Sequence, residues 1–379
     1  MARPFTVEIP EPATADLHDR LDRTRWPEPA TAPGWEQGVP LGYLRDLCDY
    51  WRWQYDWRAT ERRLNRWAQF TAEIDGVVVH FLHLRSSDPA AVPVILTHGW
   101  PGSFFEFESV IEALAATPGG APVHLVVPSL PGYGFSSKPV ASGWGVERIA
   151  HAWVELMGQL GYQRFVASGS DWGTSISTCI GLQSPDRLLG LHLVPPLVAP
   201  VGAVAERTDA EQAALARLRE RTRTGSAYSA VHATRPQTVG YSLLDSPVGL
   251  CAWLVEKIWS WADHSGDITE VLSRDQILDN VSLYWFTGTG ASSVRLYWES
   301  IAKVSEWFTE PAPDTVDVPT ACTVFPEEVP RPSLRWVQSR FSSVVHWGEP
   351  PRGGHFGAWE QPELFVAELK TAVAKLVRS

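Results

Sequence analysis

Short apolar runs recur along the chain and alternate with stretches of helical periodicity. The runs contain many β-branched residues and lie at 77–82, 94–97, 123–127, 165–167, 191–194, 320–325 and 344–347. Continuous apolar runs of this length are typical of strands that are covered on both faces. Helical periodicity appears between them, for example at 145–160, and again in an amphipathic stretch at 362–377. This alternation predicts an α/β fold with a mostly parallel central sheet.

Two regions do not follow the alternation. Residues 1–75 show the pattern of helices and turns, with Leu17 and Leu21 at helical spacing and a segment dense in aromatic residues after Leu44. Between 203 and 309 the apolar runs stop, and the pattern is again helical. We therefore predict an N-terminal helical extension (1–75), a first part of the core (76–196), an inserted helical cap (197–311) and a second part of the core (312–379).

Composition narrows the classes of protein to consider. A chain of 379 residues with 44% hydrophobic and 20% charged residues can bury a large core. It has no run of roughly 18 apolar residues and no apolar signal segment near its start, so we expect a cytoplasmic protein without a membrane partner. The net charge of −11, with no dense basic run, disfavours nucleic acid as a partner. The four cysteines are far apart, which predicts neither a disulfide framework nor a zinc site.

The strongest local signal for chemistry follows the run at 165–167. Gly169-Ser170-Asp171-Trp172-Gly173 matches a G-x-nucleophile-x-G turn between a strand and a helix. Glycines are needed on both sides because the central residue sits on a strained turn, where neighbouring Cβ atoms would collide. The central residue is Asp171, and Ser170 comes one position too early. An ordinary strand-to-helix turn with Asp171 as the helix N-cap is the alternative interpretation.

Two further segments complete the pattern of a hydrolase. His98-Gly99-Trp100-Pro101-Gly102 follows an early strand, where α/β-hydrolases place a loop that lends an N–H to the oxyanion hole. His355 follows the last predicted strand. This is where α/β-hydrolases place the triad histidine, because their triad residues come along the chain in the order nucleophile, acid, histidine. The acid should lie between Asp171 and His355, and the segment after 320–325 offers Glu327 and Glu328. Spacing alone does not choose between them.

These residues resemble the microsomal-type epoxide hydrolases, including bacterial members, over nearly the whole chain. The resemblance covers Arg25–Pro27, His98–Ser103, Pro128–Ser136, Gly169–Gly173, Asp245–Leu250, Tyr284–Trp285, Phe325–Glu328 and Gly353–Phe356. It implies an α/β-hydrolase fold with a cap. The charge-relay acid of the family is the Glu of an F-P-x-E motif, which selects Glu328 here. The lid tyrosines of the family fall on Tyr228 and Tyr297.

An aspartate nucleophile suits attack on an sp³ carbon rather than on an acyl carbon. Such attack forms an alkyl-enzyme ester, which water then hydrolyses, and this chemistry fits epoxides or alkyl halides. With an epoxide, Tyr228 and Tyr297 would protonate the opening oxygen. His355, oriented by Glu328, would then activate water, while the backbone N–H groups of Trp100 and Trp172 stabilise the oxyanion.

This mechanism needs no cofactor and no metal, and its partners are a small epoxide and water. A homodimer is a further possible partner arrangement. Two other functions remain as alternatives. A haloalkane dehalogenase would use a similar nucleophile and histidine but would need no phenol donors. A ligand-binding protein of the same fold would keep the triad with little or no turnover.

The aromatic content suggests the substrate class. The chain has 19 tryptophans, most of which we expect to pack in the core. Several aromatic residues lie on segments expected to reach the site, in addition to Trp100 and Trp172 beside it: Phe104, Phe105, Trp253, Trp285 and Trp298. They predict a bulky aromatic or conjugated epoxide as substrate. Some bacterial relatives act in natural-product pathways, including enediyne assembly, and the resemblance allows this role as well as a detoxifying or catabolic one.

Overall fold

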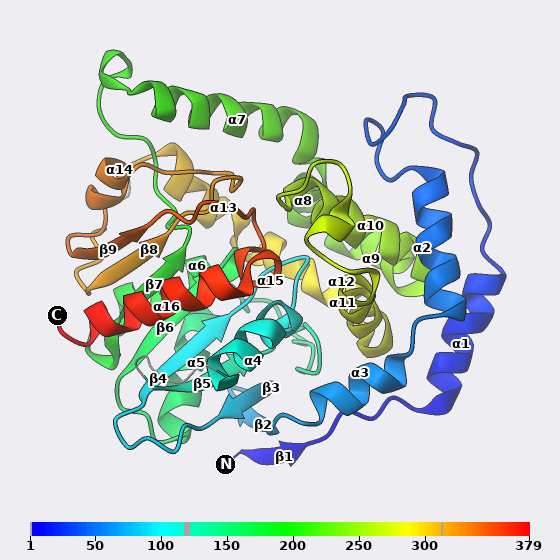
Figure 1. The fold of residues 1–379 in the computed structure, drawn as a ribbon, viewed down its shortest axis with the longest axis horizontal. Coiled ribbons are helices and arrows are strands. Elements are labelled where there is room, and N and C mark those ends of the chain that lie inside the picture. Colours follow the sequence, from blue (N-terminus) through cyan, green and yellow to red (C-terminus); the bar gives the residue numbers. More distant parts are fainter. Residues whose placement is uncertain (1, 117–121, 312–313) are drawn as a thin grey trace.

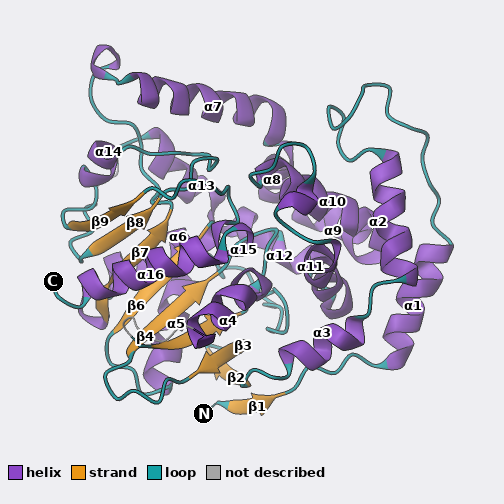
Figure 2. Ribbon diagram, viewed as in Figure 1, coloured by secondary structure: helices purple, strands orange, loops and turns teal. Residues whose placement is uncertain are grey.

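The computed structural model describes residues 2–116, 122–311 and 314–379. Its strands form one sheet in the order β1-β2-β3-β5-β4-β6-β7-β8-β9 (Figures 1 and 2). The six strands from β5 to β9 in this order pair in parallel, whereas β1, β2 and β3 form an antiparallel edge that joins the rest through β5. In chain order the bounds of β1 to β9 are Arg3–Phe5, Gln69–Ile74, Val77–Leu84, Val92–Thr97, Val123–Pro128, Phe165–Ser170, Leu188–Val194, Thr320–Thr323 and Val344–Gly348.

Helices cover both faces of this sheet, and alternate strand residues pack against each layer. Ile95 and Ala167 contact the core layer that includes α5 (Val146–Gln159) and α6 (Trp172–Gln183). Their neighbours Val94 and Val166 contact the layer that includes α16 (Pro362–Leu376), which packs beside α4 (Glu108–Ala116). Short helices α14 (Leu334–Gln338) and α15 (Gly357–Glu360) complete this part. The predicted α/β fold with a mostly parallel sheet is confirmed.

A helical segment separates β7 from β8 in the chain. It contains α7 (Asp209–Gly225), α8 (Ala227–Thr234), α9 (Pro236–Asp245), α10 (Pro247–Trp261), α11 (Arg274–Thr287), α12 (Gly290–Ser293) and α13 (Arg295–Thr309), called the inserted helices below. In Figure 1 most of them lie beside one end of the sheet. The domain limits at 196/197 and 311/312 stay predictions, and residues 312–313 lie outside the described part.

The described residues contain no single helix long and apolar enough to cross a membrane. Helices α9 and α10 pass that test of length and composition only as a pair, and a bend of 117° separates them.

The N-terminal region is less purely helical than its sequence pattern suggests. It contains α1 (Glu11–Asp22), α2 (Leu41–Trp53) and α3 (Trp57–Leu64), but β1 and β2 join the sheet. The interpretation of residues 1–75 as helices and turns is wrong for these two strands. Asp75 and Gly76, both with positive φ, form the tight turn between β2 and β3. The Asp-Gly dipeptide is a recognised hairpin signal, so the sequence contained a clue to β2, whereas β1 depends on pairing with distant residues.

A buried carboxylate connects this N-terminal region to the inserted helices. Asp279 of α11 is 2% exposed and accepts hydrogen bonds from Tyr55 (2.7 Å) and Thr60 (2.6 Å). It also pairs with Arg63 of α3, whose guanidinium binds Glu108 as well. Burial raises the pKa of Asp279, and the Arg63 charge opposes that rise. The charge of Arg63 is therefore part of what keeps a buried anion stable.

We expect Arg63→Met to lower the free energy of unfolding by about 3 kcal/mol, because it leaves Asp279 buried without its cation. Denaturation by urea, followed by circular dichroism, measures this. Arg62→Met is the matched control, since Arg62 is exposed and its pair with Asp56 should contribute at most about 1 kcal/mol. Equal effects of the two substitutions would contradict the prediction.

Candidate active site

Asp171 lies on a strained turn between β6 and α6. Its φ is 51° and its ψ is −122°, a conformation that non-glycine residues rarely adopt. The turn is also crowded: a Cβ at Gly169 would lie 2.2 Å from the carbonyl oxygen of Gly173, and one at Gly173 would lie 2.0 Å from that of Thr97. The Asp171 side chain makes no capping hydrogen bond to α6. The turn therefore presents the carboxylate instead of using it as an N-cap.

The Asp171 carboxylate has a different partner at each oxygen. Oδ1 accepts a hydrogen bond from the backbone N–H of Trp100 at 2.9 Å, and Oδ2 lies 3.5 Å from Nε2 of His355. The backbone N–H of Trp172 is the first of α6 and has no hydrogen-bond acceptor among the described residues. The structure thus brings the loop of Trp100, the start of α6 and His355 around one carboxylate.

His355 bridges two carboxylates. Its Nδ1 lies 3.0 and 3.1 Å from the two oxygens of Glu328, which is 3% exposed. Glu327 instead faces solvent and pairs with Arg217 at 2.6 Å. Burial by itself lowers the pKa of His355, but Glu328 and Asp171 outweigh it and raise the pKa to about 10. With both carboxylates charged, the imidazole is therefore protonated at neutral pH.

We expect Asp171→Asn to lower the pKa of His355 from about 10, because both the charge and the ionic hydrogen bond of Asp171 raise it. In this variant Glu328 is the remaining group that raises the pKa of His355 relative to the ordinary value of 6.5. NMR titration of ¹³C-labelled histidine measures this change. Glu327→Gln is the control and should leave the titration unaltered. A pKa that does not move in Asp171→Asn would show that the two side chains do not interact.

Tyr228 of α8 and Tyr297 of α13 line the same cavity as Asp171, with ring centroids 5.7 Å apart. Tyr228 stacks on Trp100 at 5.1 Å, and Tyr297 meets Trp172 at 4.8 Å in a T-shaped contact. Burial raises the pKa of both phenols, and the charge of Asp171 raises it further. Both groups therefore stay protonated and able to donate a hydrogen bond.

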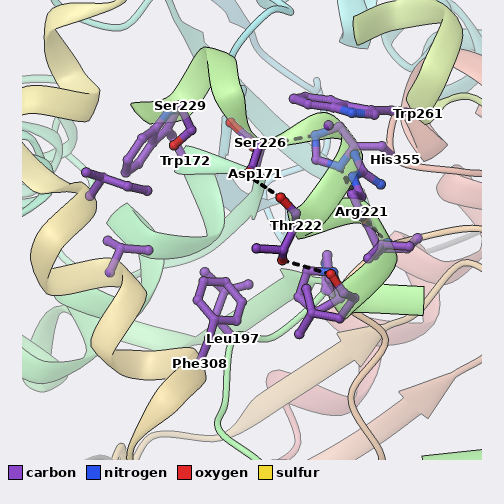
Figure 3. A pocket seen from close by; sticks show the side chains of 18 of the residues that line it. Asp171, Trp172, Leu197, Arg221, Thr222, Ser226, Ser229, Trp261, Phe308 and His355 are labelled. Atoms are coloured by element: carbon purple, nitrogen blue, oxygen red, sulfur yellow. Dashed lines mark hydrogen bonds and ion pairs between the residues drawn. The ribbon is translucent and has the colours of Figure 1, made fainter. Parts of the chain in front are cut away.

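A cavity of about 280 Å³ joins these groups, and Figure 3 shows its residues from close by. Asp171, Trp172, Glu328 and His355 line it from the sheet side. The inserted helices contribute Tyr228 and Tyr297 together with polar and aromatic side chains: Arg221, Thr222, Ser226, Ser229, Trp261 and Phe308. Aliphatic side chains, among them Leu197, Leu218, Ile301 and Val304, complete the lining, so the cavity that contains the carboxylate of Asp171 has both aromatic and aliphatic walls.

The aromatic residues that line the cavity are not those expected from the sequence. Phe104 and Phe105 stack on each other in the core, and Trp253 donates to His232 at 2.9 Å. Trp285 lies under the guanidinium of Arg20, and Trp298 is 54% exposed. None of the five lines the cavity, so this expectation is wrong. Proximity in sequence does not determine which face of a helix a ring occupies or what that face meets.

Three residues at the site carried no recognisable signal in the sequence. Trp261, at the end of α10, packs against the His355 ring at 4.9 Å, and Arg221 of α7 lies over the Trp261 ring at 4.7 Å. His232 contacts both Tyr228 and Tyr297, and burial lowers its pKa to about 3, so it is neutral.

Among the described residues, no group of three or more His, Cys, Asp or Glu side chains could hold a metal ion.

Two family models match the chain. The model for the epoxide hydrolase N terminus matches residues 2–107, and the model for the alpha/beta hydrolase fold matches residues 92–233. A provisionally named epoxide hydrolase of Stigmatella aurantiaca is 45% identical over 98% of this chain and 85% of its own length. Epoxide hydrolase 1 of Oryctolagus cuniculus is 32% identical over 97% of this chain and 87% of its own.

Solved structures agree with these sequence matches. The epoxide hydrolase of Aspergillus niger superposes with a TM-score of 0.89 at 31% identity, covering 99% of this chain and 97% of that one. The juvenile hormone epoxide hydrolase of the silkworm Bombyx mori superposes with a TM-score of 0.87 at 28% identity, covering 100% of this chain and 94% of that one. The likeness therefore extends over sheet, inserted helices and N-terminal region together.

Proposed function

The chain belongs to the microsomal-type epoxide hydrolases with the α/β-hydrolase fold, and on this premise we propose that it opens an epoxide to a vicinal diol through an ester on Asp171. The observation that carries the proposal is the meeting of the Asp171 carboxylate and two phenols, those of Tyr228 and Tyr297, in one cavity. A nucleophile and proton donors on opposite sides of a cavity are what ring opening requires.

In the first step an oxygen of Asp171 attacks a ring carbon. A C–O bond forms between the carboxylate and the substrate, while the C–O bond of the epoxide breaks and its electron pair stays on the epoxide oxygen. Tyr228 or Tyr297 gives that oxygen a proton. The Trp100 N–H holds Oδ1 at 2.9 Å, whereas Oδ2 has the looser contact, 3.5 Å from Nε2 of His355, so we assign the attack to Oδ2.

In the second step His355 removes a proton from water, and the resulting hydroxide adds to the carboxyl carbon of Asp171. The N–H groups of Trp100 and Trp172 stabilise the oxyanion until the ester C–O bond breaks. The departing alkoxide takes the proton from His355 and leaves as the diol, and the carboxyl proton of Asp171 passes through solvent to the tyrosinate left by the first step, so that all groups return to their starting states. Esterification removes the charge of Asp171, which is one cause of the raised pKa of His355. Formation of the ester therefore lowers the pKa of the histidine and readies it to act as a base.

The phenols also separate the proposal from its alternatives. A departing halide needs no proton, so a haloalkane dehalogenase would have no use for two donors above the nucleophile. A ligand-binding protein that keeps the triad differs instead in a single-turnover experiment, in which an ester would form on Asp171 without release of diol. The biological role stays a prediction, either in natural-product assembly, such as that of enediynes, or in detoxification. Location in the cytoplasm also stays a prediction.

The substrate we propose carries an aromatic or conjugated group beside the epoxide. The rings of Trp172, Trp261 and Phe308 wall the cavity together with the two tyrosines. Flat apolar groups pack well against such walls. The cavity volume of about 280 Å³ is near the lower end for ligand sites, which favours one ring system over a long chain.

We expect the protein to convert styrene oxide to its diol with a kcat/KM about 10- to 100-fold above that for 1,2-epoxybutane, since burying an aromatic ring contributes about 1.5–3 kcal/mol. Chromatography of the diols under matched conditions measures both rates. Preference for the aliphatic epoxide would contradict the proposed aromatic substrate class but would leave the proposed hydrolysis of epoxides intact. Absence of diol from both epoxides, with halide released from haloalkanes, would overturn the function itself.

A further inference from the structure

The loop that carries His355 is held by two carboxylates with no assigned role. Glu360, at the end of α15, is 6% exposed, and its Oε1 accepts a hydrogen bond from the backbone N–H of Phe356 at 2.9 Å. Its Oε2 accepts two more, from the N–H groups of Gly354 at 3.0 Å and Asp263 at 2.7 Å. One buried carboxylate thus binds backbone on both sides of His355 and on the segment after α10.

Asp263 and Trp261 complete the arrangement from the inserted helices. Oδ2 of Asp263 accepts from the N–H of Gly353 at 2.8 Å, and the carbonyl oxygen of Trp261 accepts from the N–H of His355 at 2.9 Å. The consecutive backbone N–H groups from 353 to 356 therefore each have a defined acceptor. We call Glu360 and Asp263, with the loop they bind, the histidine clamp.

We propose that the histidine clamp positions His355 for hydrolysis of the ester on Asp171, with Glu360 as its main positioning residue. This inference rests on the proposed function and deepens it. A loop with Gly353 and Gly354 has much conformational freedom, which bound N–H groups remove. The backbones also approach closely, because a Cβ at Gly354 would lie 2.5 Å from the carbonyl oxygen of Trp261.

The cost of burying Glu360 supports a positional role. Burial raises the pKa of Glu360 to about 7, and its three hydrogen bonds to backbone N–H groups oppose that rise. An apolar side chain would fill the same space without this desolvation cost, but it would leave the N–H groups of Gly354, Phe356 and Asp263 unpaired. The carboxylate therefore determines where the loop backbone lies, and with it the imidazole between Glu328 and Asp171.

The clamp should matter for one chemical step only. Ester formation uses Asp171 and the two tyrosines, whereas ester hydrolysis needs the His355 ring within reach of both a water and the ester. A displacement of about 1 Å in a catalytic group can cost on the order of 100-fold in rate. A change at Glu360 should therefore slow the second step much more than the first.

The test compares Glu360→Gln with wild type in single-turnover experiments on styrene oxide, with mass spectrometry of the peptide that contains Asp171. An amide offers only one acceptor oxygen, so it cannot reproduce acceptance at both ends of the carboxylate. We expect ester hydrolysis to slow by about 10- to 100-fold and ester formation to change less than about 3-fold. Glu363→Gln, at an exposed position of the following helix, is the matched control and should change neither step.

Ester hydrolysis at the wild-type rate, or equal slowing of both steps, would overturn the inference. If Glu360→Gln is insoluble, Asp263→Ala is measured in the same way. It removes only the acceptor of the Gly353 N–H and should slow the second step alone, by a smaller factor, and an unchanged second step would again overturn the clamp. Failure of the proposed function looks different, since no ester would then form on Asp171 even in wild type.

Discussion

Asp171→Ala is expected to reduce epoxide turnover by on the order of 10⁴- to 10⁶-fold, because it removes the carboxylate that forms the ester, and Glu328, also in the cavity lining, is held at Nδ1 of His355. The carboxylate sits on the strained turn before α6, held by the Trp100 N–H at 2.9 Å. Alanine removes the carboxylate that we propose as the nucleophile. Initial rates of diol formation from styrene oxide measure the loss, and an unchanged melting temperature would show that the variant is folded.

Isotope labelling separates a covalent path from direct attack by water. During one turnover of the wild type in H₂¹⁸O, label should enter the Asp171 carboxylate, because water attacks its carboxyl carbon. His355→Gln should still form the ester but accumulate it, since the base for the second step is missing. Label found only in the diol after a single turnover would contradict the ester mechanism, and so would a His355→Gln variant that carries no modification.

Glu328→Gln should lower turnover by about 10³- to 10⁴-fold, the scale seen when the acid of a catalytic triad is neutralised. Both oxygens of Glu328 lie within 3.1 Å of Nδ1 of His355, and their charge is the largest of the contributions that raise its pKa. Without that charge the imidazole is less well oriented and a weaker base. Steady-state kinetics over a range of pH measure both effects.

Glu327→Gln is the matched control, one residue away on the same loop. Glu327 is exposed and pairs with Arg217, so its neutralisation should change turnover by less than about 3-fold. The reverse order of effects would mean that the acid of the triad is Glu327. Equal and small effects would mean that His355 works without a carboxylate partner.

Much of the fold followed from local pattern. The runs at 77–82 and 165–167 became strands β3 and β6, and the stretch at 145–160 contains α5, because alternation and apolar run length reflect how a single element is buried. The turn at Asp171 is local as well, since its two glycines and strained residue are close neighbours in the chain. Residues 1–75 were less predictable, because β1 pairs with a strand far along the chain, Arg3 lying opposite Thr71.

Tertiary structure decided which side chains meet. Neighbouring glutamates on one loop have opposite surroundings, since Glu328 faces His355 while Glu327 faces Arg217. Spacing along the chain did not distinguish them, and before the structure only the family resemblance pointed to Glu328. The cavity walls, with Trp261 and Phe308 in place of the expected rings, depend on how the inserted helices pack over the sheet. The sequence by itself determined the elements and the strained turn, because these arise from residues close together in the chain. The partners of His355 and the shape of the cavity arise from contacts between distant segments, which a linear pattern does not encode.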